Sequence, residues 1–565
     1  MTPPVNVAAH LARRAAASPA QVAVHDGRRH VTFAQLSATT DALTHGLVAA
    51  GVVRGDRVAV MVPPSVEFFA VTFALLRLGA ISVMIDPGMG LRNLGKCLTH
   101  AEPAAFVGVT KAHAARRLLG WAKQSLKLTV NVGRWRFGCH HSTRSLTDKG
   151  LSQGPWRMPD FAPTDAAAVL FTSGSTGVAK GVNYTHGVFA AQVEALRDLY
   201  GIEPGEVDLC TFPLFALFGP ALGMTCVIPR MNPSRPATID PNKAFEQMRQ
   251  YCVTNLFGSP AVVRRLGQHP GGTDALSTLR RVISAGAPAR LDALEALQAK
   301  LPPGVEIFTP YGATECLPVS NVGTREIRGE TAALTRQGKG VCVGRPHPGV
   351  RVAVIAITDA AVPTWSDSLA LPAGVVGEFV VRGPVVTREY FRNPTATALA
   401  KITDPATGEV LHRMGDVGYL DESGRLWFCG RKSHRVETPT GTLFTDQVEP
   451  VFNEVPGVFR TALVGVTRGG VMHPVLCVEW DPFGESLPCG EGVAAERWVL
   501  GDRGAELTMA LEERAAAFPH TAGIRTFLGH NRFPVDVRHN SKIAREKLAV
   551  WADKVLGPTW NGGPA

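Results

Sequence analysis

The chain has 565 residues, more than the roughly 250–300 residues that one hydrophobic core usually organises, so we expect at least two domains. Hydrophobic residues make up 45% and charged residues 19% of the chain, a composition that excludes an intrinsically disordered protein. The net charge of +10 comes from scattered basic residues and not from a long run. This distribution argues against a nucleic-acid-binding protein and favours small anionic ligands.

The cysteines and the apolar stretches indicate where the protein works. The ten cysteines show neither a C-x-x-C pair nor a zinc-binding spacing, so we expect reduced thiols and a cytoplasmic protein. The most apolar early stretch, Val58 to Ile85, is interrupted by two prolines, by Glu67 and by Arg77. A helix of about 20 apolar residues that crosses a membrane would not carry these residues, so we predict no transmembrane segment.

The first clear structural pattern is a βαβ unit. A strand is predicted from Arg57 to Val62, a helix from Val66 to Leu78 and a second strand from Ala80 to Ile85. The same alternation continues downstream, with apolar strands predicted at 166–171, 279–284 and 305–311 and helices at 188–200 and 290–300. This order is typical of a doubly wound α/β body.

The pattern changes in the last third of the chain. Short alternating strands, Arg351 to Ile357 and Gly377 to Arg382, predict a small β subdomain at about 345–431. Mixed strands and helices then continue to Leu556. We place a boundary between Arg431 and Lys432, so residues 1–431 form a large N-terminal body and residues 432–565 a small α+β C-terminal domain.

The loop after the predicted strand at 166–171 has the composition of a phosphate-binding loop. It reads T-S-G-S-T-G-V-A-K-G, and its small residues let the backbone approach a phosphate while hydroxyl and N–H groups donate to the oxygens. Its glycines and lysine are three residues apart, unlike the G-x-x-x-x-G-K-[ST] loop. A flexible turn is the alternative, which the combination of glycines, hydroxyls and a lysine disfavours. The candidate phosphate-binding residues are Thr172, Ser173, Gly174, Ser175, Thr176, Gly177 and Lys180.

A second candidate segment, Y-G-A-T-E, runs from Tyr311 to Glu315 at the end of a predicted strand. Ligands of open α/β sheets bind at the carboxyl ends of strands, so Glu315 could hold a hard cation that bridges phosphates. Tyr311 could stack on a base. An ordinary turn explains the pentapeptide equally well when it is taken alone.

A third candidate site lies at Gly415-Asp416 and Gly430-Arg431. The carboxylate of Asp416 could accept hydrogen bonds from both hydroxyls of a ribose. The guanidinium of Arg431 could reach the ribose or a phosphate, because such groups pair well with a fixed fork of donors.

Together with Asn540-Ser541-Lys542, these segments occur in the order typical of the adenylate-forming superfamily, which the chain resembles from about residue 8 to residue 548. This superfamily contains acyl-CoA synthetases, adenylation domains of peptide synthetases and luciferases. The resemblance implies ATP as a substrate and Mg²⁺ as the metal. One departure is Ala179, where the superfamily usually has proline.

The resemblance also implies roles for single residues. It places the loop from Thr172 to Lys180 on the β- and γ-phosphates, Thr314 near the α-phosphate and Glu315 on Mg²⁺. The catalytic candidates are therefore Lys542, the adenylation lysine, with Glu315 and Thr314, and Lys432 is the hinge of a swinging C-terminal domain. The remaining nucleotide-binding candidates are Gly286, Ala287, Pro288 and Tyr311 around the adenine, Gly312 at the turn on the metal side, and Asp416 and Arg431 on the ribose.

The segment T-F-P-L-F-A-L-F-G, from Thr211 to Gly219, narrows the resemblance. Many acyl-CoA synthetases have histidine where Ala216 stands. The run F-P-L-F-A-L-F-G-P-A-L-G-M and the loop T-S-G-S-T-G-V-A-K-G resemble the β-lactone synthetases of bacterial long-chain olefin biosynthesis. Packing in a core is the alternative role for the apolar side chains that would then line an acyl site: Phe212, Phe215, Ala216, Leu217 and Phe218.

This subgroup implies a small-molecule substrate that carries its own nucleophile, a β-hydroxy acid with a long 2-alkyl chain. After adenylation its hydroxyl attacks the acyl carbon, expels AMP and closes a β-lactone without CoA. The implied pathway partners are a thiolase-like enzyme, a reductase and an α/β-hydrolase-like enzyme.

Three alternatives remain open at this point. They are a CoA or carrier-protein ligase for fatty acids, an adenylase that forms amides or esters, and a binding protein without catalysis. The presence of Lys180, Glu315, Asp416 and Lys542 argues against the last of these.

Overall fold

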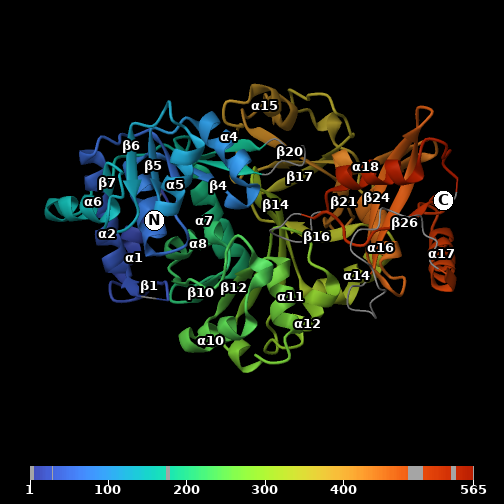
Figure 1. Cartoon of the computed structure of the whole chain (residues 1–565), viewed down its shortest axis with the longest axis horizontal. Coiled ribbons are helices and arrows are strands. Elements are labelled where there is room, and N and C mark those ends of the chain that lie inside the picture. The colour runs from blue at the N-terminus through green and yellow to red at the C-terminus, as the bar shows by residue number, and fades with distance from the viewer. Residues whose placement is uncertain (1–4, 28, 173–178, 481–500, 536–542, 564–565) are drawn as a thin grey trace.

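The computed structural model describes residues 5–27, 29–172, 179–480, 501–535 and 543–563. They form a large N-terminal body and a smaller C-terminal domain, which lies at the red and orange end of Figure 1. The body is built on two sheets, one of seven strands in the order β7-β6-β5-β3-β4-β8-β9 and one of fourteen strands. The predicted α/β class with a smaller C-terminal domain is confirmed.

The seven-stranded sheet contains the predicted βαβ unit. Strands β3 (Arg57–Met61) and β4 (Ile81–Ile85) pair in parallel, and α3 (Val66–Leu78) connects them. Ser65 caps the start of α3 by accepting a hydrogen bond from the N–H of Phe68, and Gly79, with φ of 82°, ends the helix. The other elements of this half are β5 (Ala105–Gly108), β6 (Leu128–Asn131), β7 (His141–Ser142), β8 (Ala166–Thr172), β9 (Lys180–Thr185), α4 (Leu91–Ala101), α5 (Thr110–Leu119) and α6 (Thr143–Gly150).

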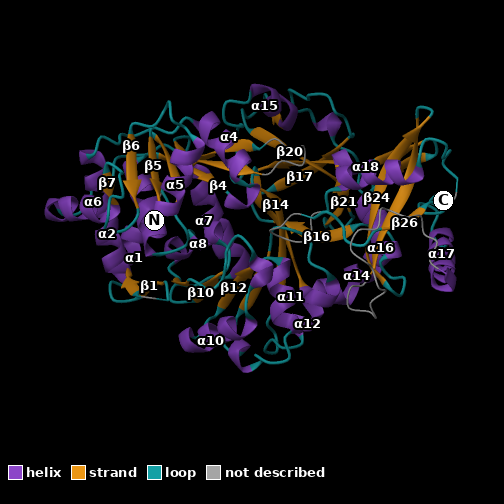
Figure 2. Ribbon diagram, in the orientation of Figure 1, coloured by secondary structure: helices purple, strands orange, loops and turns teal. Residues whose placement is uncertain are grey.

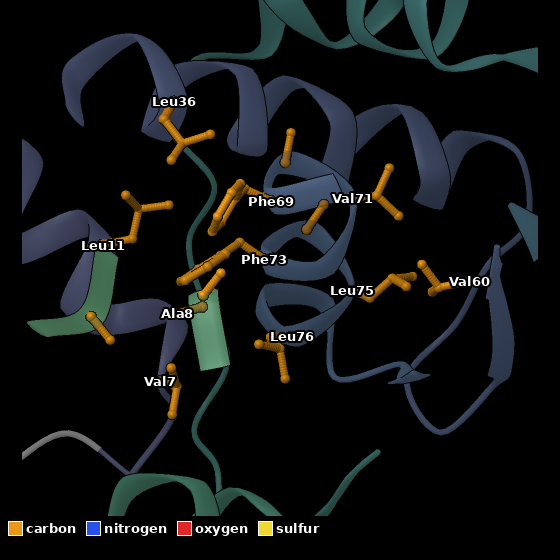
Figure 3. Close-up of a cluster of buried hydrophobic side chains, with 14 of the residues drawn as sticks. Val7, Ala8, Leu11, Leu36, Val60, Phe69, Val71, Phe73, Leu75 and Leu76 are labelled. Atoms are coloured by element: carbon orange, nitrogen blue, oxygen red, sulfur yellow. The ribbon is translucent and has the colours of Figure 1, made fainter. Parts of the chain in front are cut away.

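Helix α3 is buried on all sides and joins the sheet to the N-terminal helices α1 (Ala8–Ala17) and α2 (Phe33–Ala49). Figure 3 shows Phe69 and Phe73 of α3 pointing toward Leu11 and Leu36. The same apolar cluster extends to residues 215–222. Each such buried side chain stabilises the fold by about 1.5–3 kcal/mol, so this cluster fixes the segment that we predicted to bind the acyl group.

The larger sheet begins with parallel strands whose two faces are both covered by helices (Figure 2). Alternate residues of these strands pack on α7 (His186–Tyr200) or on the group α10 (Pro241–Tyr251), α11 (Pro260–Gln268) and α12 (Leu291–Gln298). The strands are β1 (Val22–His25), β10 (Val207–Cys210), β11 (Thr225–Val227), β12 (Asn255–Gly258), β13 (Arg281–Ser284) and β14 (Ile307–Ala313), with β2 (His30–Thr32) antiparallel at the edge. Two one-turn helices, α8 (Pro213–Ala216) and α9 (Gly219–Leu222), follow β10.

The sheet continues with antiparallel strands, which include the short strands predicted for a β subdomain. In sheet order they are β15 (Cys316–Gly323), β16 (Val341–Pro346), β21 (Leu426–Arg431), β20 (Val410–Leu420), β18 (Gly377–Arg382) and β17 (Arg351–Ile355), and β19 (Lys401–Thr403) pairs with β20. Strand β15 pairs with β14 and so joins this region to the parallel half, and β16 pairs with both β15 and β21. The short helices are α13 (Thr324–Glu326), α14 (Ala332–Arg336) and α15 (Pro394–Ala400).

The C-terminal domain has apolar clusters of its own. Strands β24 (Val458–Arg468), β25 (Val471–Trp480) and β26 (Phe527–Gly529) form its sheet, and β22 (Val436–Thr438) and β23 (Gly441–Leu443) form a hairpin. Its helices are α16 (Thr445–Phe452), α17 (Gly501–Ala516) and α18 (Arg545–Leu556). One cluster lies between the sheet and α16 and α17, and the other packs against α18.

Two sequence expectations concern the molecule as a whole. Among the helices that the structure describes, none combines the length and the apolar character that spanning a bilayer requires. Nine of the ten cysteines lie in the described ranges, and each of these nine is a free thiol.

Candidate active site

A cavity of about 880 Å³ lies between the two sheets of the body, at the ends of β8 and β14. It is lined by predicted site residues from five separate segments of the chain. These are Lys180, Phe212, Phe215, Leu217, Phe218, Gly286, Tyr311, Gly312, Thr314, Glu315, Arg431 and Lys432. The candidate residues therefore share one space, with polar groups at one end and apolar groups at the other.

The predicted phosphate loop connects two antiparallel strands. Thr172 at the end of β8 pairs with Lys180 at the start of β9, so the hairpin closes at these two residues. The predicted residues Ser173, Gly174, Ser175, Thr176 and Gly177 lie outside the described residues. The ammonium group of Lys180 is 5.2 Å from the ring centre of Tyr390 and faces the cavity.

Glu315 is held from several directions by residues that sequence reasoning missed. The hydroxyl of Tyr390 donates to Oε1 of Glu315 at 2.7 Å. The backbone N–H and the hydroxyl of Thr387 both donate to the carbonyl of Glu315, each at 2.9 Å. The ammonium of Lys401 in turn donates to the hydroxyl of Thr387 at 3.2 Å. Burial lowers the pKa of Lys401 to about 8, so this cation is held where solvent does not stabilise its charge.

The turn that carries Thr314 is fixed from the side of β9 and α7. The hydroxyl of Tyr184 donates to the carbonyl of Thr314. The amide Nε2 of Gln192 donates to the carbonyl of Leu317 at 3.0 Å. Burial raises the pKa of Tyr184 well above its usual value, so its hydroxyl keeps its proton at neutral pH.

Asp416, Arg431 and Tyr311 form one interacting group. Asp416 and Arg431 are direct partners in the antiparallel pairing of β20 and β21, and Nε of Arg431 lies 3.3 Å from Oδ1 of Asp416. The hydroxyl of Tyr311 donates to Oδ2 of Asp416 at 2.7 Å. The carboxylate raises the pKa of Arg431, while burial, reinforced by that carboxylate, raises the pKa of Tyr311. The structure thus joins Tyr311 to Asp416 and Arg431, which the sequence had placed in two separate candidate sites.

Gly286 lines the cavity and has φ of 99°, a backbone conformation that favours glycine. Ala287 and Pro288 follow it and are not among the residues that line the cavity in the described part of the chain. Arg290 ends this loop and contacts the C-terminal domain. It donates to the carbonyl of Phe459 in β24, and its guanidinium carbon is 4.8 Å from the Phe459 ring centre.

Lys432 lies directly after β21. Its ammonium donates to Oε2 of Glu378 at 3.2 Å and to the carbonyl of Thr358 at 2.9 Å. The same carboxylate oxygen is 2.6 Å from Nη2 of Arg413, and the side chains of Glu378 and Arg413 are each 1% exposed. The predicted adenylation residue Lys542 lies outside the described residues.

More apolar residues line the cavity than the sequence motifs had indicated. Phe215 stacks on Phe257 with ring centres 3.8 Å apart. Ala216, which we predicted in the acyl site, is 1% exposed and packs in the neighbouring core without lining the cavity. The structure adds apolar residues that no motif had indicated, from both sheets and from α3 and α7: Val60, Phe68, Phe73, Leu76, Met84, Phe189, Leu196 and Phe257.

The chain matches a known protein family. Residues 11–391 match the AMP-binding enzyme family. The chain belongs to the AMP-binding enzymes. An olefin beta-lactone synthetase of Xanthomonas campestris pv. campestris is 48% identical and covers 98% of each chain. An olefin beta-lactone synthetase of Stenotrophomonas maltophilia is 47% identical and covers 98% of this chain and 99% of its own.

Solved structures of other enzymes share the fold of this AMP-binding enzyme. ATP-bound MatB from Rhodopseudomonas palustris aligns with a TM-score of 0.75 at 22% identity, over 98% of this chain and 100% of its own. An amide bond synthetase from Marinactinospora thermotolerans aligns with a TM-score of 0.75 at 24% identity, over 96% of this chain and 99% of its own.

The polar end of the cavity fits a metal that arrives with a nucleotide. No cluster of three or more His, Cys, Asp or Glu residues in the described ranges is arranged to hold a metal ion. Glu315 supplies one carboxylate at the cavity wall. Asp86 and Glu378 also line the cavity, and Glu378 is paired with Arg413 and Lys432. Mg²⁺ is commonly bound by one or two carboxylates together with water and phosphate oxygens, so this donor set suits a nucleotide-bound Mg²⁺.

Proposed function

We propose that this AMP-binding enzyme is a β-lactone synthetase that acts on a long-chain 2-alkyl-3-hydroxy acid. The observation that carries the proposal is the 47–48% identity to two olefin beta-lactone synthetases over nearly the whole chain. The large apolar end of the cavity supports it, because two alkyl chains need an extended apolar wall.

The polar end would bind ATP. We assign the phosphates to the β8–β9 hairpin with Lys180, the α-phosphate to Thr314, and the ribose to Asp416 and Arg431. Glu315 would hold Mg²⁺, which neutralises phosphate charge when it is bound. The adenine would lie against Tyr311 and the segment of Gly286, Ala287 and Pro288, and Gly312 would lie at the turn on the metal side.

The reaction would occur in two steps at the junction of the two ends. A carboxylate oxygen of the acid attacks the α-phosphorus, the bond to the β-phosphate oxygen breaks, and pyrophosphate leaves. The 3-hydroxyl oxygen then attacks the acyl carbon, the bond to the AMP oxygen breaks, and AMP leaves with the released proton. Both steps depend chiefly on positioning and on neutralising charge, so no side-chain nucleophile is needed.

Movement of the C-terminal domain would separate the two steps. We place the boundary between Arg431 and Lys432, with Lys432 as the hinge and Lys542 brought to the α-phosphate for the first step. The ion pair of Lys432 with Glu378 supports this assignment, because it anchors the hinge residue to β18 of the body. We further propose that the enzyme works in the cytoplasm beside a thiolase-like enzyme, a reductase and an α/β-hydrolase-like enzyme.

Product analysis without CoA tests the proposal. The enzyme is incubated with a 2-alkyl-3-hydroxy acid, ATP and Mg²⁺, and the products are identified by NMR. We expect a β-lactone, AMP and pyrophosphate, and no lactone from the matched acid that lacks the 3-hydroxyl. A thioester that forms only when CoA is added, with no lactone in its absence, would overturn the proposal in favour of a long-chain acyl-CoA ligase or acyl-AMP ligase.

A further inference from the structure

Gln192 is a buried polar residue in an apolar part of the cavity wall. It lies on α7 with Phe189, Leu196 and Tyr200, spaced three, four and four residues apart, so all four share one face of the helix. All four line the cavity. Gln192 is 2% exposed, which is uncommon for a glutamine because its amide needs partners for two donors and an acceptor.

The orientation of the Gln192 amide follows from the bond that its Nε2 makes to Leu317. Its Nε2 donates to the carbonyl of Leu317 at 3.0 Å, a bond that the amide oxygen cannot make. Its Oε1 is therefore turned away from Leu317, and it has no hydrogen-bond partner among the described residues. A buried acceptor without a partner destabilises the fold, so its retention in this wall needs an explanation.

The amide lies close to the proposed reaction centre. Leu317 is two residues beyond Glu315 in the chain, and Tyr184, whose hydroxyl donates to the carbonyl of Thr314, also lines this part of the cavity. On its other side the face of α7 continues into the apolar wall through Leu196. Gln192 is thus placed at the junction between the end that would hold the activated carboxyl and the end that would hold the alkyl chains.

We propose that Oε1 of Gln192 accepts a hydrogen bond from the 3-hydroxyl of the substrate and thereby positions the hydroxyl oxygen to attack the acyl carbon. This proposal rests on the proposed function, because it assigns the group that recognises the hydroxy acid. The donor that Oε1 lacks is supplied by the substrate, and an acid without the hydroxyl leaves the acceptor unpaired. A site that hydrogen-bonds a substrate hydroxyl discriminates strongly against the analogue that lacks it.

The test compares two acids in pyrophosphate–ATP exchange, which reports adenylation alone. One acid carries the 3-hydroxyl and the other is its 3-deoxy analogue. Wild-type enzyme should prefer the hydroxy acid in kcat/KM by about 10-fold or more. Gln192→Met keeps the length of the side chain and removes the acceptor, so it should abolish this preference. The readout is the ratio of the two exchange rates, because loss of the bond to Leu317 affects both acids alike.

Two further variants separate recognition from packing. Gln192→Glu should restore the preference, because a carboxyl in this apolar wall stays protonated and can donate to Leu317 while its other oxygen accepts. Leu196→Met alters the same face of α7 and should change exchange with both acids equally.

An equal loss with both acids in Gln192→Met, or an unchanged preference, would overturn the proposal. The ratio of the exchange rates with the two acids tests Gln192 without regard to the product. A wild-type enzyme that makes no lactone would contradict the proposed function, but this ratio could still be interpreted. Lactone formation from the hydroxy acid should fall in Gln192→Met by at least the same factor as its exchange rate.

Discussion

The two ends of the cavity are held in place by different forces. At the polar end Tyr390 holds Glu315, and Tyr311 and Arg431 hold Asp416, all through hydrogen bonds or ion pairs of defined geometry. At the apolar end the lining comes from α3, α7 and residues 212–218, and it is held by packing such as the stack of Phe215 on Phe257. Directional bonds fix single atoms, whereas packing fixes only a volume. Substitutions at the polar end should therefore lower activity, whereas substitutions at the apolar end should change which acid the enzyme prefers.

The largest effect is expected at Lys542, which would act at the polar end. Lys542→Ala should lower pyrophosphate–ATP exchange by about 10³-fold, because a positioned cation no longer neutralises the charge that develops during adenylation. ATP binding, measured by calorimetry, should stay nearly intact. Lactone formation from a preformed acyl-adenylate should persist, since we assign the lysine to the first step only. Exchange at the wild-type rate would refute the assignment.

A second large effect is expected at Glu315. Glu315→Gln keeps an oxygen for the Tyr390 hydroxyl and removes the charge, so adenylation should fall by about 10²-fold and require more Mg²⁺. Binding of ATP without Mg²⁺ should stay as in the wild type. The matched variant Tyr390→Phe keeps the carboxylate and should show the smaller loss. Unchanged Mg²⁺ dependence in Glu315→Gln would show that this carboxylate does not hold the metal.

A change at the apolar end should shift specificity and not abolish activity. Leu217→Trp fills part of the cavity that Leu217 lines, so acids with the longest alkyl chains should lose about 10-fold or more in kcat/KM. Each methylene that no longer fits costs about 0.8 kcal/mol. Short-chain acids should be processed within about twofold of wild type in the same competition assay. A uniform loss at all chain lengths would indicate damage to the fold instead.

The smallest effect is a pH dependence of stability at Lys401. Its pKa is lowered from 10.5 to about 8 by burial, so the unfolded chain binds more protons than the folded one between about pH 8 and 10.5. The free energy of unfolding should therefore rise as the pH rises through this window, because Lys401 loses its proton. Below pH 8 the full free-energy cost of burying the charged ammonium is present. The Tm of wild type relative to that of Lys401→Met should rise between pH 8 and 10.5. A difference in Tm that does not vary with pH would contradict this assignment.

Local signals in the sequence predicted much of the body. The helix Val66–Leu78 and the strand Gly377–Arg382 have the predicted bounds, and the ends of α3 are marked by the cap of Ser65 and by Gly79. Helix α7 starts two residues earlier than predicted. Thr185 caps it by accepting from the N–H of Val188, and this cap was not recognised in the sequence.

The residues that hold the predicted site residues in place could not be predicted from local patterns. Tyr390 reaches Glu315 across 75 residues of chain, and its segment is held by a bridge to Val182 in β9 of the other sheet, so no local pattern encodes this contact. Ala216 was predicted beside the acyl group because of its place in a motif. The one-turn helix α8 instead directs Ala216 into the core, although its neighbour Phe215 lines the cavity. The roles of the individual residues stay predictions for the experiments above.

The loop from Gly286 to Arg290 connects the cavity to the C-terminal domain over a few residues. Gly286 lines the cavity, and Arg290 rests on Phe459, whose ring also lies 5.4 Å from the guanidinium carbon of Arg264. A shift of β24 relative to the body must break these contacts or displace the loop. By thermodynamic reciprocity, any ligand whose affinity depends on the position of Gly286 also biases where the C-terminal domain sits. The loop thus carries a coupling free energy between an occupied cavity and the arrangement of the two domains.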